Sequence, residues 1–117
     1  MEAKELRLNN WVNFKFSDLN SNVIICHNDL RNFERNIKIG EFNNIYKPIP
    51  LTEEFALMLG ANNTFYNNYL DFEYFEIYES NGVWYVEKEG VILCELKYVH
   101  QLQNLYFALT NKELTIK

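Results

Sequence analysis

The side chains suited to nucleophilic or metal chemistry are few: the chain has two cysteines and two histidines. Cys26 and His27 are neighbours, so on a strand their side chains would point to opposite faces. Cys94 and His100 form no CxxC or paired-histidine zinc spacing, and no serine lies in a GxSxG sequence. A Cys94–His100 pair assembled by the fold stays open as an alternative. We therefore predict a non-enzymatic protein with no catalytic residues, no metal and no cofactor.

Cationic side chains provide a possible anion site in the first half of the chain. The four glycines form neither GxGxxG nor GxxxxGK, so no glycine-rich phosphate loop is predicted. Arg31 and Arg35 are four residues apart, and in a helical turn their guanidinium groups would share one face. Such a pair could hold a phosphate or a carboxylate. In a loop the two arginines would be ordinary surface charges.

A second candidate ligand site lies at the start of a predicted C-terminal helix. Tyr98 and His100 would stand where free backbone amide groups can receive an anion. Gln103 and Asn104, on the next turn, could donate hydrogen bonds to a nucleobase edge or to a neighbouring backbone. The alternative is that His100 and Gln103 cap the helix or fasten it to a sheet.

Aromatic and acidic residues alternate along a predicted hairpin around Asn81-Gly82, the strongest short-range hairpin signal in the chain. A two-residue turn pairs Glu76 with Glu87, and like charges facing each other across a ladder are unfavourable. Three explanations stay open: a solvated face, Lys88 reaching over, or a basic or metallic ligand. The tyrosines Tyr74, Tyr78 and Tyr85 are predicted on the face opposite Ile77 and Val86, where they would form an interface with a partner or with a second copy. The alternative is that they are simply buried under the helices.

Hydrophobic periodicity and turn residues predict an α+β fold with antiparallel sheets. A Thr52-capped short central helix over 53–59 divides the strands, and a C-terminal helix beginning near Val99 packs on the sheet. Asn9-Asn10 is a predicted turn, as is 17–22, and Asn111 is the predicted left-handed helix stop. The predicted strands are 11–16, 23–26, 37–39, a weaker 42–46, and a C-terminal meander of 72–79, 83–88 and 91–96.

Length and charge limit the class of protein further. The 117 residues predict a single domain, 1–117, and no apolar run is long enough for a membrane span. The first residues have no apolar signal-peptide core, so we expect a cytoplasmic protein. The net charge of −5 argues against general nucleic-acid binding, which needs a basic stripe.

Three sequence segments carry a resemblance to a known family. They are ELRLNNWV near the start, PIPLTEEF in the middle and YVHQLQNLYFALT near the end. Together they resemble a family of small uncharacterised proteins from Bacteroidetes and their phages or prophages, in which the same three segments occur in this order. The resemblance implies a phage or prophage context in a bacterial host and brings no established activity.

Two hypotheses about function follow from the residues and from this resemblance. The first is an intracellular anti-defence protein that sequesters a small anionic, nucleotide-like signalling molecule without altering it, at a pocket in a homo-oligomer. The alternative is an adaptor or inhibitor that binds a host or phage protein, with its acidic surface steering it toward a basic partner.

Overall fold

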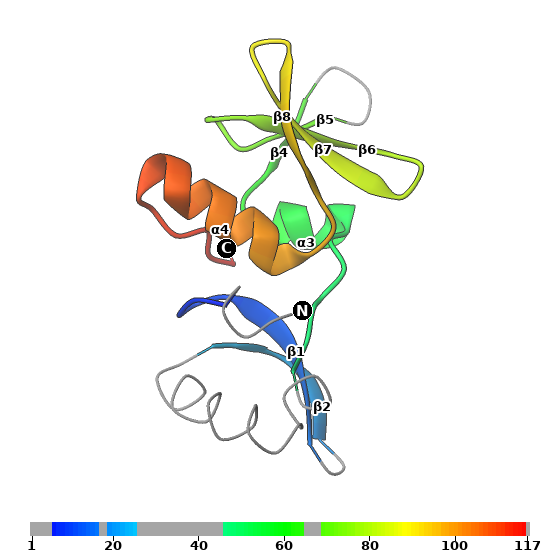
Figure 1. Cartoon of the computed structure of the whole chain (residues 1–117), viewed down its shortest axis with the longest axis vertical. Coiled ribbons are helices and arrows are strands. Elements are labelled where there is room, and N and C mark those ends of the chain that lie inside the picture. Colours follow the sequence, from blue (N-terminus) through cyan, green and yellow to red (C-terminus); the bar gives the residue numbers. More distant parts are fainter. Residues whose placement is uncertain (1–5, 17–18, 26–45, 65–68, 117) are drawn as a thin grey trace.

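The computed structural model describes residues 6–16, 19–25, 46–64 and 69–116. In these ranges the chain forms two antiparallel sheets, with the helices α3 and α4 lying between them (Figure 1). The α+β class predicted from the sequence is confirmed. Arg31, Arg35, Cys26, His27 and the predicted strand 37–39 lie outside the described residues.

The N-terminal sheet has the strand order β2-β1-β3. β1 (Trp11–Phe16) is the strand predicted from its alternating residues, and β3 (Tyr46–Lys47) pairs with its middle. β2 (Leu19–Ile24) begins earlier than predicted, since 17–22 was assigned to a turn. Asn20, Ser21 and Asn22 are polar and exposed on this edge strand, which hid their extended conformation. Among the described residues, the buried core of this sheet contains Leu6, Val12, Ile25 and Tyr46.

A proline-flanked segment leads from this sheet to α3 (Glu53–Met58). Pro50 forms an isolated antiparallel bridge with Tyr98, so the extended segment lies against the start of α4. Thr52 caps α3 as predicted: its Oγ1 accepts a hydrogen bond from the backbone N–H of Phe55 at 3.1 Å. Gly60, with φ 105°, follows the helix end in a conformation that favours glycine.

The second sheet has five strands in the order of the chain. The predicted meander forms its last three strands, and the register predicted around Asn81-Gly82 is confirmed, including Glu76 opposite Glu87. The strands are β4 (Asn62–Asn63), β5 (Tyr69–Asp71), β6 (Glu76–Ser80), β7 (Val83–Lys88) and β8 (Val91–Leu96).

The predicted strand 72–79 is wrong in its first half, because a turn separates β5 from β6. The backbone N–H of Phe72 donates to the carbonyl of Phe75 at 2.9 Å, and Glu73 has a positive φ of 76°. Phe72 and Phe75 at the two ends of this turn are both buried, whereas Glu73 between them is exposed. The sequence pattern therefore looked like one continuous strand.

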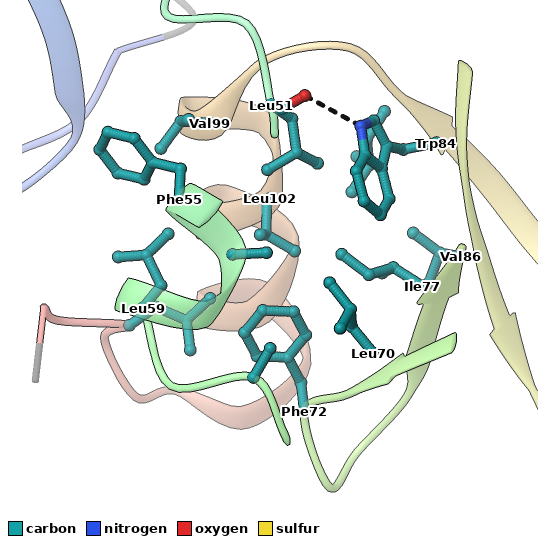
Figure 2. Close-up of a cluster of buried hydrophobic side chains, with 14 of the residues drawn as sticks. Leu51, Phe55, Leu59, Leu70, Phe72, Ile77, Trp84, Val86, Val99 and Leu102 are labelled. Carbon is teal, nitrogen blue, oxygen red and sulfur yellow. Dashed lines mark hydrogen bonds between the residues drawn. The ribbon is translucent and has the colours of Figure 1, made fainter. Parts of the chain in front are cut away.

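The main hydrophobic core lies between the five-stranded sheet and the two helices. Figure 2 shows Ile77 and Val86 pointing from the strands toward Leu102 of α4 (Val99–Thr110). The indole Nε1 of Trp84 donates to the carbonyl of Leu51 at 2.9 Å, so this large side chain is buried with its polar atom satisfied. α4 ends at Asn111, which has the predicted left-handed conformation at φ 59°.

Neither helix in the described ranges has the length and apolar character that crossing a membrane requires.

Candidate functional site

Two surfaces carry the residues that the sequence singled out. The first is a polar cluster where α4 meets the turn before β1; we call it the polar clamp. Arg7 lies at its centre: Nε donates to Oδ1 of Asn104 at 2.8 Å, and one terminal nitrogen donates to Glu113 Oε1 at 2.6 Å. The other terminal nitrogen reaches the backbone carbonyl of Gln103 at 3.2 Å. The clamp consists of Arg7, Asn10, Gln103, Asn104 and Glu113.

Gln103 connects α4 to the turn before β1. Its Oε1 accepts from the backbone N–H of Trp11 at 2.7 Å, and its Nε2 donates to the carbonyl of Asn9 at 2.9 Å. Asn10 adds a third link, because its Nδ2 donates to Oδ1 of Asn104 at 2.9 Å. Gln103 and Asn10 are fully buried, so these hydrogen bonds satisfy groups that water does not reach.

Local sequence explains why these side chains meet. Asn9 adopts a positive φ of 70°, which turns the chain so that Arg7 and Asn10 both approach α4. On α4, Asn104 and Phe107 are three residues apart and share a face. The guanidinium carbon of Arg7 lies 4.3 Å from the centre of the Phe107 ring, an additional cation–π contact.

The residues near the start of α4 that were predicted to bind an anion therefore have internal contacts. Gln103 fastens α4 to the turn before β1, which is the alternative that the sequence left open. His100 is buried, and its ring stacks on Tyr98 with centres 5.9 Å apart and an interplanar angle of 8°. Gln101, which was not predicted, caps the helix, because its Oε1 accepts from the backbone N–H groups of Lys97 and Tyr98.

A shallow groove of about 570 Å³ follows this side of α4. Its cation among the described lining residues is Arg7, whose donors are directed at Glu113, Asn104 and the Gln103 backbone. A carboxylate also lines the groove, which disfavours an anion there. The lining residues are Arg7, Glu95, Leu96, His100, Gln101, Asn104, Phe107 and Ala108.

The second surface is the face of the five-stranded sheet that points away from the helices; we call it the tyrosine face (Figure 1). Tyr69, Tyr78 and Tyr85 stand opposite one another on β5, β6 and β7. The rings of Tyr69 and Tyr78 are 4.9 Å apart, and those of Tyr78 and Tyr85 are stacked at 5.4 Å. All three side chains are half-buried, so parts of the rings stay accessible.

A row of carboxylates lies beside these tyrosines. Asp71, Glu76 and Glu87 are directly opposite one another on the same three strands, which is an unfavourable arrangement of like charges. Within the described ranges none of the three forms an ion pair, since the salt bridge there joins Arg7 to Glu113. Lys88 does not relieve the repulsion, because it follows Glu87 along the strand and so has its side chain on the other face.

Tyr69 connects the two rows. Its hydroxyl donates to Oε2 of Glu87 at 3.2 Å. Partial desolvation, then this hydrogen bond and the nearby Glu87 charge, raise the pKa of the Tyr69 phenol above its ordinary value. The phenol therefore stays a neutral donor, which orients one carboxylate and leaves the rest of the row to the solvent.

The predicted interface residues are only partly brought together. Tyr78 and Tyr85 lie on the tyrosine face, whereas Tyr74 belongs to the β5–β6 turn and packs its ring against Tyr106, with centres 5.7 Å apart. Tyr69 takes the third place on the tyrosine face. It was missed because it directly follows Asn67-Asn68, which predicted a loop.

Catalysis and metal binding gain no support from the described residues. Burial raises the pKa of the Cys94 thiol, which disfavours the thiolate that a nucleophile requires. Within the described ranges no three histidine, cysteine or acidic side chains are placed to hold a metal ion, the carboxylate row included.

No protein-family model, no curated protein and no solved structure matches this chain.

Proposed function

We propose that the chain is a protein-binding adaptor or inhibitor whose tyrosine face receives a basic segment of another protein. The observation that carries this proposal is the row formed by Asp71, Glu76 and Glu87, three facing carboxylates with no cation among the described residues. Mutual repulsion within the row is relieved when a positive charge is placed over it.

The chemistry of the face fits lysine and arginine side chains. Arginine binds carboxylates through two parallel hydrogen bonds, and its planar group also stacks on aromatic rings. The stacked Tyr78 and Tyr85 rings supply such a platform next to Glu76 and Glu87. Tyrosine also suits protein interfaces, because it combines a large contact area with a polar tip.

The whole molecule reinforces this preference. Its net charge of −5 attracts basic partners over distances longer than direct contact and accelerates their association at low ionic strength. The same charge repels a free nucleotide from the tyrosine face. The nucleotide-sequestration hypothesis stays a prediction, since Arg31 and Arg35, its proposed phosphate ligands, lie outside the described residues. The phage or prophage context likewise stays a prediction.

Titration calorimetry with synthetic peptides tests the proposal. The probes are an arginine-rich peptide, a lysine-rich peptide and an acidic peptide of equal length. We expect binding of the basic peptides, weakening with added salt, and no binding of the acidic peptide. Glu87→Lys should weaken basic-peptide binding at least tenfold, about 1.4 kcal/mol.

Two further variants separate a specific site from general charge attraction. Glu54→Lys makes the same charge change on the exposed start of α3, away from the tyrosine face, and should leave the affinity almost unchanged. Tyr85→Ala keeps the charge but removes part of the aromatic platform, and should weaken binding of the arginine-rich peptide. Equal losses for Glu54→Lys and Glu87→Lys would show that only net charge attracts the peptide, and the proposed site would be wrong.

A further inference from the structure

The turn that joins β6 to β7 contains the one asparagine of the chain that a glycine follows. Asn81 and Gly82 are both exposed, with left-handed φ values of 54° and 81°. Figure 1 shows this turn at the free end of the β6–β7 hairpin. Apart from the chain neighbours of Gly82, no described atom lies within 4 Å of the point where a side chain would begin. The amide of Asn81 and the backbone after it therefore stand at an open tip.

This pair of residues has a reaction of its own. The backbone nitrogen of Gly82 bonds to Cγ of Asn81, and the bond from Cγ to Nδ2 breaks. The amide nitrogen leaves as ammonia, taking the proton of the Gly82 N–H, and a five-membered cyclic imide remains. Water then opens the ring at either carbonyl, which gives aspartate or, when the backbone carbonyl is attacked, isoaspartate. Water is the single co-reactant.

We propose that Asn81 is a site of spontaneous deamidation, at which water converts the β6–β7 turn into an aspartyl and an isoaspartyl form. The glycine is decisive, because it places no β-carbon beside the attacking nitrogen. The equivalent turn Glu89-Gly90 has almost the same φ values but presents a carboxylate in place of an amide, so it has no ammonia to release.

Asn111 provides an internal comparison. It is exposed and left-handed like Asn81, with a φ of 59°. The residue after it is Lys112, whose backbone N–H donates to Oγ1 of Thr110 at 3.1 Å. At Asn81 the ladder pairs the flanking residues Ser80 and Val83, so the nitrogen of Gly82 lies outside the ladder. The two asparagines thus share a backbone conformation and differ in the nitrogen that would attack.

The reaction requires the turn to open locally. Ring closure needs rotation about the Cα–C bond of Asn81, which disturbs the last pair of the ladder, Ser80 with Val83. Ser80 is exposed and Val83 is half-buried, so this opening uncovers little of the core. The folded chain should therefore react more slowly than an unfolded peptide, and faster at Asn81 than at Asn111.

The two products affect the sheet differently. Asp-Gly suits the same two-residue turn as Asn-Gly, so the aspartyl form keeps the register of β6 and β7. Isoaspartate adds a backbone carbon to the turn, which then no longer has the length that sets this register. The affected pairs include Tyr78 with Tyr85 and Glu76 with Glu87. Deamidation would thus alter the tyrosine face, whatever binds there, so the inference is independent of the proposed function.

Mass spectrometry of the full chain, incubated folded in mildly alkaline buffer, tests the inference. Cleavage after glutamate releases residues 80–87, in which Asn81 is the one asparagine. We expect this peptide to gain one mass unit and to separate into two species, while Asn111 stays intact. In heavy-oxygen water the gain should be larger by two units, because the new oxygen comes from the solvent. Asn81→Gly keeps a dipeptide that suits the turn and should gain no mass in this peptide.

A synthetic peptide of residues 80–87 supplies the reference rate for an unfolded chain. Asn81 that stays intact in the folded chain after several half-lives of this peptide would overturn the inference. So would Asn111 reacting as fast as Asn81, because the following glycine would then not decide the site.

Urea denaturation of the separated products tests the effect on the sheet. Asn81→Asp is the standard for the aspartyl form and should unfold at the same urea concentration as the unmodified chain. The isoaspartyl form, identified by its labelling with an isoaspartate methyltransferase, should unfold at a lower concentration. Equal midpoints for the two forms would overturn the claim that the modification disturbs the register of β6 and β7.

Discussion

At the scale of single residues, Gln103 shows how a side chain that looked like a ligand-binding residue acts within the protein. It bonds the backbone carbonyl of Asn9 and the backbone N–H of Trp11, the first residue of β1, and it is fully buried. Gln103→Leu keeps the volume approximately and removes both hydrogen bonds. We expect the free energy of unfolding to fall by about 2 kcal/mol, since two backbone groups lose their partners. Urea denaturation measures the change. The exposed control Thr115→Ala should be neutral, and an equally stable Gln103→Leu variant would contradict this role.

Tyr69 offers a test by pH at the same scale. Its phenol has a raised pKa, so in the folded protein it loses its proton later than an ordinary tyrosine. The corresponding contribution to stability is complete below the unfolded pKa of about 10 and is lost as the pH rises from there through the folded value. Ultraviolet titration of tyrosinate, with Tyr69→Phe subtracted, should show a transition above pH 10. Glu87→Gln should move this transition downward, because it removes the carboxylate charge. An unmoved transition would mean that Glu87 does not influence Tyr69.

At the scale of elements, the two hairpin turns of the five-stranded sheet have the same length but different first residues. Asn81-Gly82 and Glu89-Gly90 both have two positive φ values, 54° and 81° in the first and 52° and 81° in the second. Asparagine tolerates this conformation better than glutamate does. Glu89→Asn should therefore stabilise the protein by about 0.5–1 kcal/mol, and the mirror change Asn81→Glu should destabilise it by a similar amount. Thermal denaturation at low protein concentration measures both. Changes of the same sign would contradict this explanation.

Turn and cap residues are what allowed the sequence to predict the ends of several elements. Asn81-Gly82 fixed the register of β6 and β7, and Thr52 and Asn111 marked helix ends, because each places a specific chemical group at a specific backbone position. The turn after β5 was missed because buried Phe72 and Phe75 are apolar. Tyr69 was missed because its neighbours predicted a loop.

The polar clamp could not be predicted for a different reason. Its hydrogen bonds join Arg7 and Asn10 to residues more than ninety positions later in the chain. Local periodicity carries no information about such distant pairs. Gln103 and Asn104 were recognised as unusual polar residues on a core-facing helix, but the sequence did not identify the backbone groups that they bind.

At the scale of the whole molecule, the two sheets contact the helices in different ways. The five-stranded sheet packs on both helices through the main core, whereas the described residues of the N-terminal sheet form a separate cluster around Val12 and Tyr46. The N-terminal sheet contacts the helices through the polar clamp and through the edge-to-face packing of Trp11 on Phe55, with ring centres 5.8 Å apart.

Hydrogen exchange tests whether the polar clamp holds the N-terminal sheet on the helices. Arg7→Met removes the hydrogen bonds of Arg7 and its ion pair with Glu113 but keeps an unbranched side chain beside Phe107. Amides of β1 and β2 should then exchange about tenfold faster, whereas those of β6 and β7 keep their protection. A tenfold change corresponds to a loss of about 1.4 kcal/mol in the free energy of opening, and we expect this loss only in the sheet that the clamp contacts. Lys112→Met, which removes a cation near Tyr74, is the matched control and should change neither sheet. Equal acceleration in both sheets would mean that the molecule opens as one cooperative unit, because the clamp would then stabilise the entire fold rather than the docking of its N-terminal sheet.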